Sequence, residues 1–226
     1  MKTLLTLALT TALTGIGAAA TITQTQFYSF IPTNTTPLTF NQFDTSLGSL
    51  TSITITTTVT KSGGSLFVDN DSATAATGTI SQEVTINLSS GSVALIDGVP
   101  SPIGVNITAT TGFGVTLAAD DLDGAGFQVG GPDYGGTFFD SLTVSETKNV
   151  NTGFFSGYLG VGTYVINAKG TQGTDTTAVG GAAFQGTPAN ASGDVTITYN
   201  YEAVPEPASA LLGSLGVLAL LRRRRH

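Results

Sequence analysis

The chain has 226 residues, a formal net charge of −7, no cysteine, no tryptophan and a single histidine, His226. This composition excludes disulfides and cysteine nucleophiles, and it leaves too few ligands and bases for a zinc centre or a Ser-His-Asp triad. Residues 21–203 contain three basic and 14 acidic side chains, a net charge of −11, so we expect no nucleic-acid partner.

The first 20 residues have the pattern of a secretory signal peptide. Lys2 gives a positive start, residues 4–16 form an apolar segment interrupted by threonines, and residues 18–20 form an A-x-A site at Ala18 and Ala20. We expect a signal helix that signal peptidase removes between Ala20 and Thr21. A retained N-terminal anchor is the alternative, which the short apolar segment disfavours.

An aromatic segment opens the body of the chain at residues 38–54, LTFNQFDTSLGSLTSIT. Phe40 and Phe43 are expected to bury aromatic surface, and Asp44 is expected to cap a turn. Gly48 would supply a backbone conformation that larger residues do not reach. These are structural roles, and they predict a tight turn that leads into a long strand.

The same segment resembles the opening of the choice-of-anchor E domain. The residues that carry the resemblance are Phe40, Gln42, Phe43, Asp44, Ser46, Leu47, Gly48 and Leu50, with Thr198, Tyr199 and Tyr201 in a closing strand. The resemblance implies one domain over roughly residues 25–203 that is held at the cell surface by an anchor. Such domains have no established activity, so it implies architecture and location alone.

Alternating apolar and hydroxyl side chains predict β-structure along the body. In residues 50–60, Ile53, Ile55 and Val59 would face one way and the threonines the other. Similar runs occur at 79–88, 104–117, 138–144, 158–168 and 194–201, with glycine-rich breaks between them. We expect an all-β fold, an antiparallel β-sandwich with jelly-roll or Greek-key connections, and a barrel as the alternative. Helix should be scarce outside the two terminal segments.

One acidic cluster could bind a metal ion. Asp120, Asp121 and Asp123 precede Gly124, and Asp133 follows further on. Calcium takes about six to eight oxygen ligands, and an acidic turn of this kind supplies several. The EF-hand pattern fails because the twelfth position counted from Asp121 is Pro132. A solvated turn held by side-chain hydrogen bonds is the ordinary interpretation, so we expect no obligatory cofactor, with calcium as the candidate if one binds.

The C-terminal segment 204–226 combines a proline break, an apolar run and a cluster of arginines. Pro205 and Pro207 cannot continue a strand. Residues 208–221 carry no charge and would form a helix of about 21 Å, shorter than the roughly 30 Å of a hydrocarbon core. The basic residues that follow would stay cytoplasmic; they are Arg222, Arg223, Arg224 and Arg225. A temporary transmembrane helix and a marginal permanent anchor both fit this length.

This three-part tail resembles the PEP-CTERM sorting signal of Gram-negative bacteria, with its motif at Val204, Pro205, Glu206 and Pro207. The resemblance implies processing by an exosortase, transient residence in the inner membrane, and delivery to the cell surface or extracellular matrix of cells that make exopolysaccharide. The expected domains are therefore a signal peptide at 1–20, an extracellular β-sandwich at 21–203 and a sorting segment at 204–226.

These features together predict an exported, non-catalytic surface protein, structural or adhesive, that is associated with exopolysaccharide or matrix. The alternative is a module that binds or cleaves glycans through Tyr134, Tyr158 or Tyr164 and nearby acids. Cleavage stays possible because a carboxylate-based glycosidase needs only two suitably spaced acids. The missing tryptophan removes the favoured platform for stacking a sugar ring.

Overall fold

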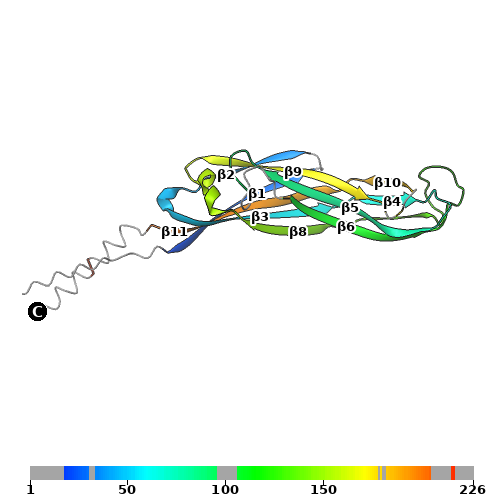
Figure 1. Ribbon diagram of the computed structural model, residues 1–226, viewed down its shortest axis with the longest axis horizontal. Coiled ribbons are helices and arrows are strands. Elements are labelled where there is room, and N and C mark those ends of the chain that lie inside the picture. Colours follow the sequence, from blue (N-terminus) through cyan, green and yellow to red (C-terminus); the bar gives the residue numbers. More distant parts are fainter. Residues whose placement is uncertain are drawn as a thin grey trace, which may run out of the picture.

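The computed structural model describes residues 18–30, 34–95, 106–177, 179, 182–204 and 215–216. The described residues form two four-stranded sheets and one three-stranded sheet, and every pairing between the named strands is antiparallel. The prediction of an antiparallel β-sandwich is confirmed (Figure 1).

The first large sheet has the strand order β1-β11-β3-β8, with bounds Ala19–Phe30, Asn190–Ala203, Gly48–Ser62 and Leu142–Asn149. The second has the order β2-β9-β5-β6, with bounds Thr35–Asn41, Thr163–Asp175, Ala76–Ser89 and Asn106–Leu117. The small sheet has the order β10-β4-β7, with bounds Ala183–Thr187, Ser65–Asp69 and Tyr134–Phe138. Two short 3-10 helices, η1 (Thr45–Leu47) and η2 (Thr152–Tyr158), lie between strands.

Strand β3 shows why the sequence folds into sheets. Ile53, Ile55 and Val59 are at most 1% exposed, because a strand with a period of two residues turns them all to the inner face. On the outer face, the hydroxyl groups of Thr56 and Thr60 lie 2.8 Å from those of Thr147 and Thr143 on β8. Cross-strand threonine pairs of this kind stabilise an antiparallel sheet, so both faces of β3 contribute to the stability of the fold.

The aromatic opening segment has the structural roles that its sequence predicted. Phe40 and Phe43 are each 1% exposed. The carboxylate of Asp44 caps η1 by accepting a 2.9 Å hydrogen bond from the backbone N–H of Ser46. Gly48 has φ of +154°, and a Cβ atom there would collide with the backbone carbonyl of Glu202. Only glycine fits this close approach between the start of β3 and the end of β11.

The interior is divided into two apolar cores. The larger lies between the two four-stranded sheets and includes Phe43, Ile86, Tyr158, Tyr164 and Tyr199. The smaller lies under the three-stranded sheet, where Leu66 and Val68 of β4 contact Ile80, Val115 and Leu117. The three-stranded sheet thus forms a separately packed extension of the sandwich.

The described chain enters and leaves the sandwich at the same end. The N–H of Ala203 donates to the carbonyl of Ala18 at 3.0 Å, and that of Val204 donates to the carbonyl of Leu47 at 3.0 Å. We call this the proximal end. At the opposite, distal end lie β4, β7, β10 and the loops 69–75 and 118–133 (Figure 1). The 14 residues of β11 alone extend about 45 Å at roughly 3.3 Å per residue, so the two ends are well separated.

Some strand boundaries differ from those predicted. The run expected at 138–144 is split between β7 and β8, because residues 139–141 turn the chain from the small sheet into the first large sheet. The run expected at 158–168 starts instead as η2, and β9 begins at Thr163. Strand β1 begins at Ala19, which lies before the predicted signal cleavage point.

Residues 1–17 of the predicted signal peptide lie outside the described residues, and so does the C-terminal helix apart from Leu215 and Gly216. Within the described ranges, no helix has the length and apolar character needed to cross a membrane.

Candidate functional site

The distal end holds an acidic loop whose two ends meet. The N–H of Ala118 donates to the carbonyl of Pro132 at 3.0 Å, which closes the loop at its base. The N–H of Asp120 donates to the carbonyl of Ser72 at 2.9 Å, which ties the loop to its neighbour 69–75. Residues far apart in the sequence are thereby brought to one place.

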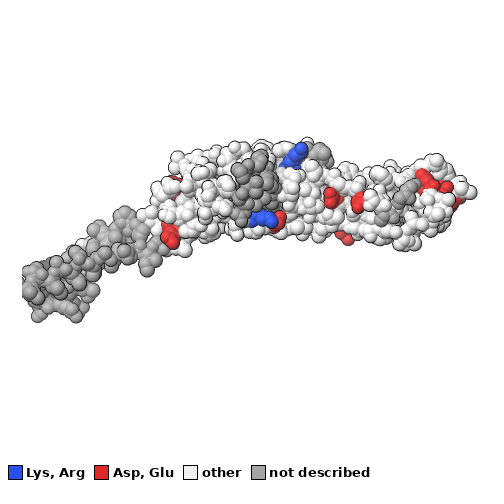
Figure 2. All heavy atoms as spheres, in the orientation of Figure 1, with Lys and Arg blue, Asp and Glu red and all other residues white. Residues whose placement is uncertain are grey.

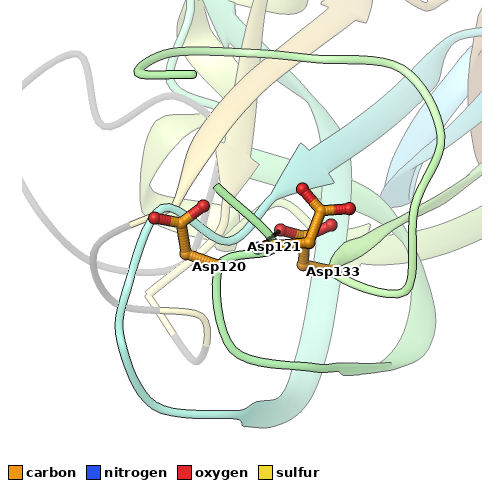
Figure 3. A group of neighbouring side chains, drawn as sticks. All are labelled: Asp120, Asp121 and Asp133. Carbon is orange, nitrogen blue, oxygen red and sulfur yellow. Dashed lines mark hydrogen bonds between the residues drawn. The ribbon is translucent and has the colours of Figure 1, made fainter. Parts of the chain in front are cut away.

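Three carboxylates gather where the ends of this loop meet. Asp120, Asp121 and Asp133 each offer an oxygen, and these oxygens lie within 4.8 Å of one another (Figure 3). Asp120 is partly exposed, Asp121 is exposed and Asp133 is 1% exposed. We call these three residues the aspartate triad.

Side-chain hydrogen bonds of the kind expected in an acidic turn are present at the start of the loop. Asp120 Oδ1 accepts from the N–H of Leu122 at 2.9 Å, and Asp121 Oδ1 accepts from the N–H of Asp123 at 3.2 Å. Each of these bonds uses one oxygen of a carboxylate, which leaves Asp120 Oδ2 and Asp121 Oδ2 for other partners. The turn interpretation therefore accounts for part of the cluster.

Asp133 is the member of the triad that a solvated turn does not explain. Its Oδ2 accepts a hydrogen bond from the N–H of Asp121 at 2.9 Å. Its Oδ1 is buried and has no hydrogen-bond partner within the described part of the chain. A Cβ atom built on Gly131 would lie 2.8 Å from this Oδ1 and would also collide with Asp121 Oδ2. The two oxygens thus face the same small space above Gly131.

The neighbouring loop adds a second buried carboxylate. Asp69, at the end of β4, is 1% exposed, and its Oδ2 accepts a 2.6 Å hydrogen bond from the N–H of Gln128. Its Oδ1 is buried without a partner among the described atoms. Asp71 differs because it is exposed, and its Oδ2 accepts from the N–H of Gly126 at 3.1 Å. Both residues fasten the middle of the acidic loop to loop 69–75.

Asp123, which the sequence analysis placed among the possible ligands, is not part of the triad. It is exposed, and its backbone N–H rather than its carboxylate contacts Asp121. Desolvation in the loop, followed by the charges of Asp121, Asp69, Asp133 and Asp120, raises the pKa of its carboxyl group. Its place is taken by Asp133, which is distant in sequence and is brought in by closure of the loop.

The distal end is strongly acidic and has little basic compensation. Figure 2 shows acidic side chains at the distal tip and basic side chains only further back on the face in view. In the described ranges the one ion pair joins Lys148 to Glu146, away from this tip. Lys61 is the basic residue that most closely precedes the acidic loops in the sequence. Its ammonium group contacts the carbonyl of Gly63 and the ring of Phe139, and not a carboxylate of these loops.

An aromatic groove lies beside the acidic loops on the three-stranded sheet. Phe67 of β4 stacks on Tyr134 of β7 with ring centroids 5.9 Å apart, and it meets Phe138 edge-on at 5.4 Å. Phe127 of the acidic loop meets Tyr134 edge-on at 5.8 Å. These side chains and Val129 line a groove of about 260 Å³. Phe138 and Val129 are each 77% exposed, so apolar surface faces solvent here.

Two of the three tyrosines that the alternative glycan-binding interpretation named lie in the core. Tyr158 is fully buried, and its hydroxyl group donates to the carbonyl of Ala94. Tyr164 is 2% exposed, and its hydroxyl oxygen lies 2.7 Å from that of Tyr199. Of the three, only Tyr134 lines the groove, and its partners there are phenylalanines whose role the sequence did not predict. A signal that could have identified Phe138 is its spacing of four residues from Tyr134, which places both aromatic side chains on one face of a strand next to the acidic loop.

Only some of the predicted processing residues are described by the structure, and these lie at the proximal end. Ala18 pairs with the end of β11, Ala20 lies in β1, and Val204 is 58% exposed directly after β11. The remaining residues of the sorting motif and the arginine cluster lie outside the described residues; they are Pro205, Glu206, Pro207 and Arg222–Arg225.

No protein-family model and no curated protein matches the chain. Among solved structures, the chain is similar to an infectious bursal disease virus particle, with 10% identity, coverage of 84% of this chain and 36% of that chain, and a TM-score of 0.23. A VP2 subviral particle of that virus has 15% identity, coverages of 92% and 49%, and a TM-score of 0.19. The chain spans less than half the length of these proteins, and likeness at such TM-scores supports no argument about function.

Proposed function

We propose that this chain is an exported, surface-sorted, non-catalytic protein that acts as a structural or adhesive component beside exopolysaccharide or extracellular matrix. Signal peptidase would remove residues 1–20, and the tail 204–226 would hold the protein in the inner membrane until an exosortase processes it. The sequence patterns of the two terminal segments support this route.

The observation that carries the proposal is the position of the two chain ends. Ala18 and Val204 lie at the proximal end, so a tail that begins at Val204 would hold that end toward the membrane. The acidic loops and the aromatic groove would then point away from the cell, at the far end of strands such as β11, which is about 45 Å long. Presentation of a distal surface is the geometry that a surface protein requires.

Removal of residues 204–226 tests this route. In cells that carry an exosortase, the truncated protein should be lost from the surface fraction and accumulate in the periplasm, while the full chain should reach the surface. Surface protein recovered from these cells should lack Arg222–His226 by mass spectrometry. Intact arginines on surface protein, or unchanged surface retention of the truncated chain, would contradict the sorting proposal.

We also propose jelly-roll connections for the sandwich. When β4, β7 and β10 are set aside, the remaining eight strands have the orders β1-β11-β3-β8 and β2-β9-β5-β6. The chain thus crosses between the sheets at most of its connections, and its first and last strands are neighbours. Paired Greek keys produce this arrangement, which supports the proposal.

The aromatic groove favours a second candidate function, binding of a glycan. Exposed aromatic side chains supply flat apolar faces for sugar rings, and the acids beside them supply hydrogen-bond acceptors. A glycan array on the full chain should show binding that is lost in Phe138→Ala and kept in Phe27→Ala. Phe27 is a matched control because it is 75% exposed, close to the 77% of Phe138, but lies on β1. Equal binding by the two variants, or no binding by the wild type, would remove this candidate.

A further inference from the structure

We propose that the aspartate triad of Asp120, Asp121 and Asp133 is a calcium site that joins the two ends of the acidic loop. This inference is independent of the sorting route and of glycan binding. Its starting point is Asp133 Oδ1, a buried carboxylate oxygen with no hydrogen-bond partner among the described atoms.

A buried carboxylate oxygen without a partner lowers the stability of the fold, because it has lost its hydrogen bonds to water and forms none with the protein. Asp133 Oδ1 is in this position, and it faces the space above Gly131 together with Asp121 Oδ2. Two negative oxygens that face one small space also repel each other. A bound cation removes both costs at once, since it pairs the buried oxygen and reverses the repulsion.

The ligand chemistry favours calcium over other metal ions. The three residues supply oxygen ligands only, whereas zinc prefers the sulfur and nitrogen of cysteine and histidine. Magnesium requires near-ideal octahedral geometry and is usually held by one or two carboxylates, while calcium accepts irregular sets of oxygens. Three carboxylates on one irregular loop therefore suit calcium, with water completing the shell.

The hydrogen bonds leave suitable atoms for this role. Asp121 Oδ2 and Asp120 Oδ2 are not used by the turn, whose bonds involve Oδ1 of each residue. Asp133 is held in place through Oδ2, so its Oδ1 is presented without movement of the backbone. Because Asp121 is exposed, the site has access to solvent for entry of the ion.

A cation here would order the wall of the aromatic groove. It would connect Asp120 and Asp121 with Asp133 and so fix the segment between them, which includes Phe127 and Val129 of the groove. Asp69 and Asp71 already fasten the middle of this segment through Gln128 and Gly126. Calcium would add a clamp at its two ends.

Titration of CaCl2 into the metal-free full chain tests the proposal, by calorimetry and by thermal unfolding. We expect a dissociation constant of about 0.1–1 mM, the range of extracellular calcium modules. At a calcium concentration tenfold above that value, the melting temperature should rise by about 3–6 °C. MgCl2 at equal ionic strength should give a smaller rise. No heat and no calcium-specific rise in melting temperature would overturn the proposal.

Variants then assign the site to the triad. Asp133→Asn should weaken calcium binding by about tenfold or more and abolish the thermal response. The matched control Asp71→Asn removes the same charge from the neighbouring loop and should keep the affinity within about threefold. If Asp133→Asn does not fold, the exposed Asp121→Asn takes its place with the same expected loss. Equal affinity in the triad and control variants would show that calcium binds elsewhere and would contradict the assignment.

Discussion

The buried tyrosines near the proximal end and the buried aspartates at the distal end differ in how completely their polar atoms are hydrogen-bonded. In the proximal part of the core, Tyr199 donates to the carbonyl of Asn41 at 3.0 Å, and its oxygen lies 2.7 Å from the hydroxyl group of Tyr164. At the distal end, Asp69 and Asp133 are each 1% exposed, and each has one buried oxygen without a partner in the described chain. The tyrosine cluster is completed by the chain itself, whereas the aspartates require something from outside.

This difference indicates which end has a task beyond stability. A buried polar group that the chain satisfies contributes to a unique core, while an unsatisfied one lowers stability unless a ligand binds. The distal end also holds the aromatic groove, in which Phe138 and Val129 are each 77% exposed. Both features are expected where a fold binds something, and both lie away from the end at which the chain enters and leaves.

The largest expected effect is alkaline unfolding through the buried tyrosines Tyr28, Tyr158, Tyr164 and Tyr199. Burial raises the pKa of Tyr199 to about 12, and burial is also the main cause that raises the pKa values of Tyr28, Tyr158 and Tyr164. Because these folded values exceed the unfolded value of about 10, the stability they contribute is complete below pH 10 and is lost as pH rises through the folded values. Urea midpoints should hold to about pH 10 and fall steeply toward pH 12. A constant midpoint across this window would contradict this account of the cluster.

Truncation of an aromatic ring should lower the free energy of unfolding much more near the proximal end than at the distal end. Tyr199→Ala removes a fully buried ring and should lower the free energy of unfolding by about 3–5 kcal/mol. Phe138→Ala removes a ring that is 77% exposed and should change it by less than about 0.5 kcal/mol. Urea denaturation of the two variants makes the comparison. Similar losses in both would mean that the distal aromatic side chains belong to the core rather than to a surface.

Removal of one hydroxyl group tests whether the tyrosine cluster is internally satisfied. Tyr199→Phe keeps the ring but leaves Tyr164 and the carbonyl of Asn41 without this partner. The free energy of unfolding should fall by about 1–3 kcal/mol. Tyr201→Phe, on the same strand but partly exposed, is the control and should have little effect. Equal effects of the two changes would argue against a special role for the buried hydroxyl pair.

The smallest effect has the opposite sign. Without calcium, Asp133→Asn should raise the free energy of unfolding by about 1 kcal/mol, because it removes a buried charge whose Oδ1 has no partner. Asp71→Asn, in an exposed position, should stay within about 0.5 kcal/mol of the wild type. The measurement is urea denaturation in the presence of a chelator. A clear loss of stability in Asp133→Asn would indicate that the carboxylate is already satisfied.

The sequence predicted the parts of the fold that depend on local pattern. The alternation of Ile53, Ile55 and Val59 with threonines identified β3 and its inner face, and Phe43 and Gly48 were assigned roles that the structure confirms. Strands β1 and β2 were not predicted. Strands β4, β7 and β10 were not predicted either, because each has only five residues, and two contain glycines that weaken the pattern. Their pairing depends on the tertiary arrangement rather than on periodicity.

The candidate site could be predicted only in part for a similar reason. Asp120 and Asp121 were identified because they are adjacent in the sequence, and this adjacency also drew in Asp123, which lies outside the triad. The importance of Asp133 depends on closure of the loop between Ala118 and Pro132, which no local pattern shows. Likewise, Tyr158 and Tyr164 were named as ligand contacts in the alternative interpretation, because spacing alone does not tell which face of the sandwich a tyrosine occupies.

Hydrogen exchange of the full chain with and without calcium tests the central contrast most directly. Calcium should slow the exchange of backbone amides in residues 118–134 and 69–75, where the triad and its supporting loop lie. Amides of β11 around Tyr199 should not change, because the proximal core is already complete. Protection confined to the distal loops is the predicted result. Calcium protection spread evenly over both ends, or absent from both, would contradict the account.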